Sequence, residues 1–256
     1  MVFRELISME REKLQNYLDQ NPFAKLRDVV AQLLYDEIIS LNITPGTKLN
    51  INQIAANLGI SRTPVAEAVA QLCERGFVVT RPDAGGHFVL DLSMSDMINL
   101  YRVRAAIECE AAALCTERAS SAVIAQLDTL ANEFRDCVIK KDNHGMIETD
   151  MPFHSLIVTS SRDPYVIKCY NLLLPNLTMY QASMVEFISS SRENPWSSSV
   201  SYNHTAIVSA IKMHIPDLAR QAMSDHVTAS LNYTMFSGGA NSFHLKLRAK
   251  MGEINK

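Results

Sequence analysis

The sequence predicts a mainly α-helical protein with two domains: an N-terminal winged helix-turn-helix, made of three helices and a β-hairpin, followed by an all-α helical bundle. Three observations predict this class. Apolar residues follow helical spacing up to residue 76, two β-rich runs flank a glycine-containing loop between residues 77 and 90, and every later apolar pattern is helical. The length of 256 residues suits two modest domains better than one small core.

Composition and charge are those of an ordinary soluble globular protein. Hydrophobic residues make up 47% of the chain and charged residues 20%. No apolar run approaches the roughly 20 residues that a membrane span needs, and the N-terminus is charged throughout and lacks an apolar secretion core. We therefore expect a cytoplasmic protein with no membrane contact. The five cysteines show no C-x-x-C spacing, so we interpret them as reduced, small hydrophobic residues.

An amphipathic helix is predicted before the first domain. Residues 1–21 carry an apolar stripe that ends at Asn21-Pro22, and this helix either packs on a partner or lies on the surface. Residues 22–90 form the winged helix-turn-helix domain. It begins with helical spacing up to residue 41, a turn at Pro45-Gly46 and a short helix at 50–58.

The helix after Gly59 is the element of this domain that is suited to contact DNA. Ser61 is predicted as its N-cap, Pro64 is tolerated in its first turn, and Gly76 ends it. A helix whose N-terminal end protrudes in this way fits the major groove of DNA, which is about 12 Å wide. The hairpin at 77–90 would bring a glycine-rich tip to the adjacent backbone or minor groove. The alternative is a winged helix that contacts only protein.

The charge balance limits how this domain can bind DNA. The net charge of the whole chain is −3. Residues 23–90 hold equal numbers of cations and anions: Lys25, Arg27, Lys48, Arg62, Arg75 and Arg81 against Asp28, Asp36, Glu37, Glu67, Glu74 and Asp83. Affinity must therefore come from a few well-placed donors and from their doubling in a homodimer.

The rest of the chain is predicted to be helical. A short hinge at 91–96 leads into a helical domain at 97–236, and 237–256 form a tail. A mid-helix proline costs a hydrogen bond and kinks the helix, and Pro152 lies between Asp150 and His154. We therefore expect that helix to begin at Thr149 as N-cap, with Pro152 in its first turn. Helices are predicted at 95–117, 121–140, 150–160, 163–190, 200–214 and 216–236.

Residues 45–89, PGTKLNINQIAANLGISRTPVAEAVAQLCERGFVVTRPDAGGHFV, resemble the GntR family of transcription regulators. The shared features are the PG-x-x-L turn, the LGxSRTPV-x-EA segment and the glycine-tipped wing. Two positions depart from the family: Ala66 replaces an arginine that reads bases, and Asn52 replaces a charged residue. Because a bidentate guanine contact is worth roughly 1–3 kcal/mol of discrimination, either the operator differs or binding depends more on other donors. The resemblance implies major-groove contacts, and we assign the DNA-binding residues as Asn52, Ser61, Arg62, Thr63, Arg81 and Gly86.

The C-terminal half resembles the all-helical FCD effector domain of the FadR-type branch of that family. The likeness lies in Tyr101-x-x-Arg104-x-x-x-Glu108, in Asp150-x-x-Phe153-His154 and in the stretch from His204 to His226. Asp150 and His154 stand four apart, so on one helix they share a face. The resemblance implies that all four metal-ligand candidates face the same interior: Asp150, His154, His204 and His226.

One carboxylate and three imidazoles form a donor set suited to a divalent transition metal. Zinc is the preferred ion, nickel, manganese and iron are alternatives, and calcium fits poorly. The four ligands complete a tetrahedral zinc site, or they leave octahedral positions for water or a ligand carboxylate. Arg104 has two interpretations: a salt bridge with Glu108 at i+4, or a cavity residue that binds the carboxylate of an effector. The resemblance favours the second.

We therefore predict a sequence-specific DNA-binding transcription regulator, a repressor and not an enzyme. A homodimer would bind double-stranded DNA at a palindromic operator. A small carboxylate effector, bound at the metal and Arg104, would modulate that binding. Two alternatives are a regulator for which the metal itself is the effector, and a metal-dependent hydrolase. The sequence offers the hydrolase no H-E-x-x-H motif or comparable glutamate.

Overall fold

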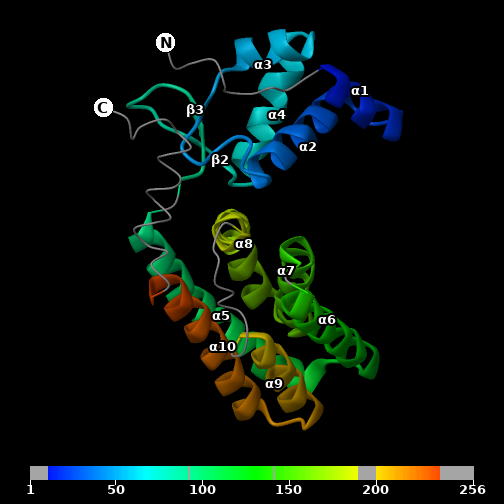
Figure 1. Cartoon of the computed structure of the whole chain (residues 1–256), viewed down its shortest axis with the longest axis vertical. Coiled ribbons are helices and arrows are strands. Elements are labelled where there is room, and N and C mark those ends of the chain that lie inside the picture. Colours follow the sequence, from blue (N-terminus) through cyan, green and yellow to red (C-terminus); the bar gives the residue numbers. More distant parts are fainter. Residues whose placement is uncertain (1–10, 92, 141, 190–199, 237–256) are drawn as a thin grey trace. The chain divides into compact units, whose positions relative to one another are not determined.

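The structure is a computed structural model, and it describes residues 11–91, 93–140, 142–189 and 200–236 (Figure 1). The chain divides between residues 92 and 93 into two compact units. Among the described residues, no helix is both long and apolar enough to cross a membrane. The N-terminal part of the predicted helix 1–21, up to residue 10, and the predicted tail 237–256 lie outside the described residues.

The first unit contains four helices and a small sheet within the described residues. The helices α2, α3 and α4 form the core of the unit, and α1 packs against α2 and α3. The elements are α1 (Arg11–Gln20), α2 (Leu26–Ile39), β1 (Lys48–Leu49), α3 (Ile51–Leu58), α4 (Arg62–Glu74), β2 (Val78–Thr80) and β3 (His87–Val89). The apolar positions of α2, α3 and α4 meet in a core of Val30, Leu33, Leu34, Ile38, Ile54, Leu58, Val65, Val69 and Leu72, all buried.

Local signals set the limits of α3 and α4. The side chain of Asn50 accepts hydrogen bonds from the backbone N–H groups of Asn52 and Gln53 at 3.1 and 3.2 Å, so it caps α3. Gly59 ends α3 in the left-handed region with φ +67°, a conformation that glycine adopts without a Cβ penalty. α4 begins directly after Ser61, whose backbone is extended. The predicted helix-turn-helix is therefore present.

The sheet has three strands in the order β1-β3-β2, and both pairs are antiparallel. The predicted hairpin is formed by β2 and β3, with Val79 opposite Phe88. β1 pairs with the other edge of β3, which places Lys48 opposite Phe88 as well. β1 was not predicted from the sequence, because a strand of two residues leaves no alternating pattern.

The described part of the N-terminal helix packs on its own unit. In α1, Leu14 is buried. The ammonium of Lys13 lies 2.8 Å from Glu37 Oε1 on α2, and the hydroxyl of Tyr17 donates a hydrogen bond to Asp36. Of the two predicted arrangements, the structure has α1 lying on the surface of the first unit.

The second unit is all α-helical in the described residues. α10 packs along α5, α6 packs against α7 and α9, and α7 and α8 both contact α5 (Figure 1). α5 begins at Met94, inside the segment predicted as a hinge, behind a capping box in which Ser93 and Asp96 satisfy each other's backbone N–H groups. The helices are α5 (Met94–Arg118), α6 (Ser121–Lys140), α7 (Asn143–Ser160), α8 (Pro164–Ser189), α9 (Val200–Lys212) and α10 (Pro216–Phe236).

The expectation that the helix around Asp150 begins at Thr149 is wrong. α7 begins at Asn143, because Asp142 is its N-cap and accepts a hydrogen bond from the N–H of Gly145 at 3.0 Å. Thr149 does not cap the helix: its hydroxyl donates to the carbonyl of Gly145 at 2.7 Å, one turn earlier. Pro152 therefore lies inside α7, where it cannot donate an intrahelical hydrogen bond. Asp150 and His154 still share this helix.

Candidate functional site

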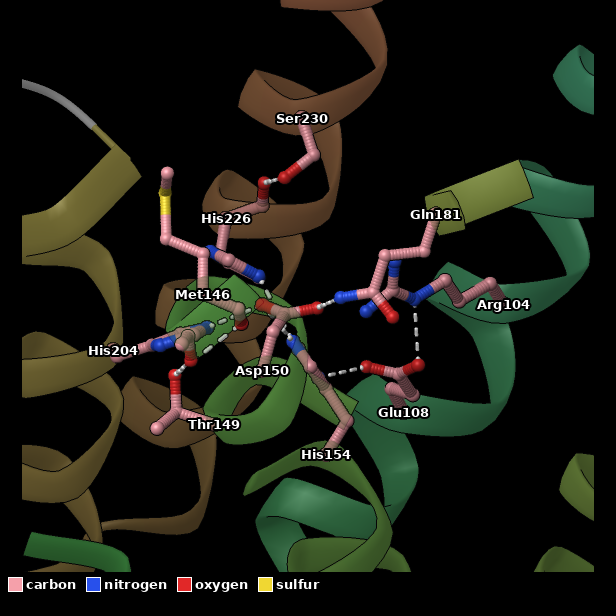
Figure 2. A network of polar contacts seen from close by, with 11 residues as sticks. Arg104, Glu108, Met146, Thr149, Asp150, His154, Gln181, His204, His226 and Ser230 are labelled. Carbon is pink, nitrogen blue, oxygen red and sulfur yellow. Dashed lines mark hydrogen bonds and ion pairs between the residues drawn. The ribbon is translucent and has the colours of Figure 1, made fainter. Parts of the chain in front are cut away.

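Three helices of the second unit bring a carboxylate and three imidazoles together. α7 contributes Asp150 and His154, α9 contributes His204, and α10 contributes His226 (Figure 2). One candidate ligand atom from each residue lies within 4.8 Å of all the others. The histidines are buried, whereas the side chain of Asp150 is 17% exposed. Solvent therefore reaches these four residues at the aspartate.

The distances within this cluster fit an ion between the side chains. Oδ1 of Asp150 lies 3.3 Å from Nε2 of His204 and 3.6 Å from Nε2 of His154. Nε2 of His226 lies 3.1 Å from Nε2 of His154, so two imidazole nitrogens face each other in the cluster. Nε2 of His204 is buried, and among the described residues it makes no hydrogen bond of good geometry, although Asp150 is close to it. A cation at the centre would satisfy these nitrogens, which otherwise leave a buried polar group unpaired at a cost of about 1–3 kcal/mol.

The electrostatics of the cluster favour ligation by neutral imidazoles. Burial lowers the pKa of His204 and, together with the charges of His204 and His154, holds the pKa of His226 well below its ordinary value. Burial opposes ionisation of Asp150, but His154 and His204 outweigh it and hold the pKa of the carboxyl well below its ordinary value. The cluster therefore offers two bare nitrogens and an ionised carboxylate at neutral pH.

Glu108 on α5 orients His154. Its Oε2 lies 2.6 Å from Nδ1 of His154, and its Oε1 lies 2.7 Å from Nε of Arg104 (Figure 2). Burial alone would raise the pKa of Glu108, but the charges of Arg104 and His154 lower it to about 2. An ionised carboxylate at Nδ1 places the proton of the ring there and turns Nε2 toward the cluster. The same carboxylate outweighs burial and raises the pKa of His154.

Asp150 and His204 are also oriented by neighbouring side chains outside the cluster. The side-chain amide of Gln181 on α8 donates to Oδ2 of Asp150 at 3.0 Å, which leaves Oδ1 for the cluster. The ring of Phe153 stacks on His204 with centroids 4.2 Å apart, and the ring of Phe134 lies 4.5 Å away. Apolar rings and outer hydrogen bonds of this kind keep ligands in one orientation and limit access of water. The arrangement can hold a divalent transition metal.

A second candidate site lies at the N-terminal end of α4 in the first unit. Ser61, Arg62 and Thr63 are all exposed there, and the side chain of Ser61 makes no capping hydrogen bond. Ser61 is thus at the predicted N-cap position, but its hydroxyl accepts no capping hydrogen bond from the backbone of α4. Asn52, near the start of α3, and Ala66, on α4, are exposed as well. These positions can face a duplex without displacing any part of the core.

The wing gathers cations around one aromatic ring. The guanidinium of Arg81 lies 5.1 Å and the ammonium of Lys48 5.6 Å from the ring centroid of Phe88. Lys48 also donates to the carbonyl of Ala84 at 3.3 Å. Gly86 has φ +126°, and a Cβ there would lie 3.0 Å from Cε of Lys48, so glycine permits this close approach. In the part of the chain that the structure describes, neither cation has an acidic partner.

Comparison with known proteins identifies both units. The family model for bacterial regulatory proteins of the gntR family matches residues 26–89, which span α2 to β3. The FCD domain model matches residues 99–229, just over half of the chain. The chain belongs to the GntR family. The predicted family, with its FCD branch, and the predicted fold class are both confirmed.

Similar proteins agree with this assignment. The HTH-type transcriptional repressor RspR of Escherichia coli strain K12 is 26% identical over 209 residues, covering 81% of this chain and 88% of RspR. The gluconate operon transcriptional repressor of Bacillus licheniformis is 27% identical over 146 residues, covering 57% of this chain and 59% of the repressor. The E. coli McbR/YncC structure has the same fold, with a TM-score of 0.67 at 19% identity, covering 84% of this chain and 99% of McbR.

This GntR protein is accordingly a DNA-binding transcription regulator and not an enzyme. The prediction that it is not an enzyme is confirmed, and the hydrolase alternative has no support from the family or from the relatives. The salt bridge between Arg104 and Glu108, one of the two interpretations of Arg104, is present and buried. Whether Arg104 also binds an effector stays a prediction.

Sequence reasoning missed three residues that the structure places around the two sites of this GntR regulator. Glu108 entered the sequence analysis only as a partner of Arg104, and its contact with His154 depends on how α5 packs against α7. Gln181 lies 31 residues beyond Asp150 and carries no sequence signal. Lys48 could have been found from its place directly after the PG-x turn, had β1 been predicted.

Proposed function

We propose that this GntR protein is a repressor whose DNA binding is modulated by a small organic acid, bound at a divalent metal that Asp150, His154, His204 and His226 hold. Zinc is the preferred metal, with nickel, manganese and iron as the alternatives. The protein acts as a homodimer on a palindromic operator, because two winged helices read two half-sites about one helical turn apart.

One observation carries the metal assignment. Three buried nitrogens and one carboxylate oxygen, from three helices, lie within 4.8 Å of one another. A protein rarely buries three imidazoles against each other without a compensating partner. The outer contacts from Glu108 and Gln181 support the same conclusion, since they fix the ligands in orientations that serve a metal.

The nature of the effector follows from the charges beside the cluster. A bound divalent metal supplies a Lewis-acidic position at which a carboxylate can bind. Arg104 is buried next to Glu108, which contacts His154 of the cluster, and its planar guanidinium is suited to a second carboxylate contact. The relative named for the gluconate operon offers a parallel, because gluconate is a small organic acid. Effector binding must favour one arrangement of the two winged helices over another, or operator binding would not change.

DNA binding is assigned to the exposed end of α4 and to the wing. Arg62 is the candidate for a base contact, and Ser61 and Thr63 flank it. Asn52, Arg81 and Gly86 contact the backbone or the minor groove. Because Ala66 cannot make the bidentate guanine contact of an arginine, Arg62 carries a larger share of the discrimination.

The experiment combines metal analysis with DNA binding. The wild-type chain selects a duplex from a random-sequence library, and its binding is followed by fluorescence anisotropy while sugar acids, hydroxy acids and dicarboxylates are added. We expect one bound metal per chain and a weakened affinity for the duplex with at least one acid. The His204→Ala variant should lose the metal and the response to the acid while it keeps basal DNA binding.

A second candidate function uses the same cluster. If the metal is itself the effector, chelation and re-addition of the metal should switch DNA binding reversibly in the absence of any acid. A metal that survives dialysis, with a response to an acid alone, supports the proposal above. A metal-free wild-type chain that still responds to the acid would overturn it.

A further inference from the structure

A helix outside the family-matched region packs against the DNA-binding unit. The gntR match begins at residue 26, whereas α1 ends at Gln20. α1 packs against α2 and α3 (Figure 1). Its Leu14 is buried, and its Lys13 forms an ion pair with Glu37 of α2 at 2.8 Å. α1 therefore has a defined place next to the helix-turn-helix.

The first residue of α1 lies over the turn of the helix-turn-helix. Atoms Cδ, Nε and Cζ of Arg11 lie 3.6, 3.8 and 3.9 Å from the position that a Cβ on Gly59 would occupy. Gly59 ends α3, and Ser61 is the N-cap of α4. The guanidinium of Arg11 therefore lies beside the turn at Gly59. This brings a positive charge next to the end of α4 that carries Arg62.

Among the described residues, Arg11 has no acidic partner. Arg11 is also exposed. Lys13, two residues further on, is paired with Glu37. Arg27 on α2 lies within ion-pair distance of both Asp28 and Glu67. Arg11 thus differs from neighbouring cations of the unit, whose charges serve internal contacts.

We propose that Arg11 contacts a phosphate of the DNA backbone, so that α1 extends the DNA-binding surface beyond the recognition helix and the wing. When the N-terminal end of α4 enters the major groove, the phosphates that border the groove lie next to the turn that precedes it. A guanidinium suits this position, since its parallel N–H groups match two phosphate oxygens. The contribution matters here because residues 23–90 have no excess of positive charge.

The test uses the full-length wild-type chain and the duplex that it selects from a random library. Each phosphate contact adds about 0.9 to the slope of log K against log salt concentration. Arg11→Gln should therefore lower that slope by about 0.9 per bound chain. It should also weaken binding about two- to fivefold per bound chain at 0.1 M salt, the effect of one exposed ion pair. Arg11→Lys should restore most of the slope, since it keeps the charge.

Lys168→Gln is the matched control. Lys168 is exposed on α8 of the other unit, has no acidic partner among the described residues, and its loss changes the net charge equally. The proposal is overturned if Arg11→Gln and Lys168→Gln have the same salt slope, or if Arg11→Lys fails to restore it. A wild-type chain that selects no duplex at all would instead count against the DNA-binding assignment, so the two failures are distinguishable.

Discussion

Replacing Glu108 by glutamine tests the outer contacts of the metal cluster most directly. The carboxylate is fully buried and touches two cationic groups, at 2.7 Å from Nε of Arg104 and 2.6 Å from Nδ1 of His154. Glutamine keeps the shape of the side chain but removes its charge, and its single carbonyl oxygen cannot accept from both neighbours. The substitution therefore removes the carboxylate that is paired with the buried guanidinium of Arg104.

Two magnitudes follow from this geometry. Removing one partner of a buried ion pair costs about 3–5 kcal/mol, so the metal-free second unit should lose about that much of its free energy of unfolding. Mutation of a residue that orients a metal-bound histidine weakens the metal by about 10- to 100-fold, and we expect the same loss for Glu108→Gln. The first effect concerns Arg104, and the second concerns His154.

Urea unfolding followed by far-ultraviolet circular dichroism measures the first effect, and competition with a chelator of known affinity measures the second. Because the two units can unfold separately, the transition of the second unit is identified as the one that added metal shifts. The double variant Arg104→Met/Glu108→Gln is the control, since it removes the unpaired cation. It should be more stable than Glu108→Gln alone, and its metal affinity should stay low.

Two results would refute this reasoning. A Glu108→Gln chain with unchanged metal affinity would mean that Glu108 does not orient His154. A double variant that is less stable than the single one would mean that Arg104 is stabilised by other groups, and Asp150 is one charge that acts on it.

The remaining predictions concern the two sites separately. Arg62→Ala should weaken binding to the selected duplex at least 10-fold, the equivalent of losing one base contact of about 1–3 kcal/mol, while metal content by mass spectrometry stays at the wild-type level. His204→Ala should do the opposite, with metal content near zero and affinity for DNA within about twofold of wild type; equal metal in both variants would contradict the assignment of the ligands. The pKa of His154 is raised and those of His204 and His226 are lowered, so as the pH falls His154 is the first of the three to take up a proton that competes with a metal. Metal affinity should therefore fall as the pH falls, and calorimetry in buffers of different ionisation enthalpy will measure the protons released on binding. The pKa of Glu108 is about 2 in the folded chain, below its ordinary value of 4.5, so its contribution to the stability of the metal-free protein is present above pH 4.5 and should be lost as the pH falls toward 2. Glu108→Gln should flatten that acid limb of the stability curve.

Much of the fold could be predicted because its signals are local. The break at Gly59, the proline at the start of α8 and the glycine-tipped hairpin act within a few residues, and the structure has each of them where the sequence predicts it. The start of α7 was predicted wrongly because Pro152 was given more weight than the capping residue Asp142. α7 continues through Pro152 although a mid-helix proline removes one hydrogen bond, and it packs against α6 and α5.

For the metal cluster, local spacing predicted the shared face of only two of the four ligands. Asp150 and His154 share a helix face because they are four residues apart, which any helix guarantees. The placement of His204 and His226 beside them came from resemblance to a family, since no periodicity relates residues on different helices. The contacts of Glu108 and Gln181 with the cluster could not be predicted, because both cross between helices.

By itself the sequence determined the order of the elements, the exposed Arg62 end of α4 and the residue types available for metal binding, since propensity, capping and hydrophobic spacing act along the chain. The tertiary structure alone decided that four ligand atoms lie within 4.8 Å of one another, that buried Glu108 orients His154, and that Arg11 lies beside Gly59. Those distances depend on how helices pack against one another. Packing is set by the whole core and not by any one segment.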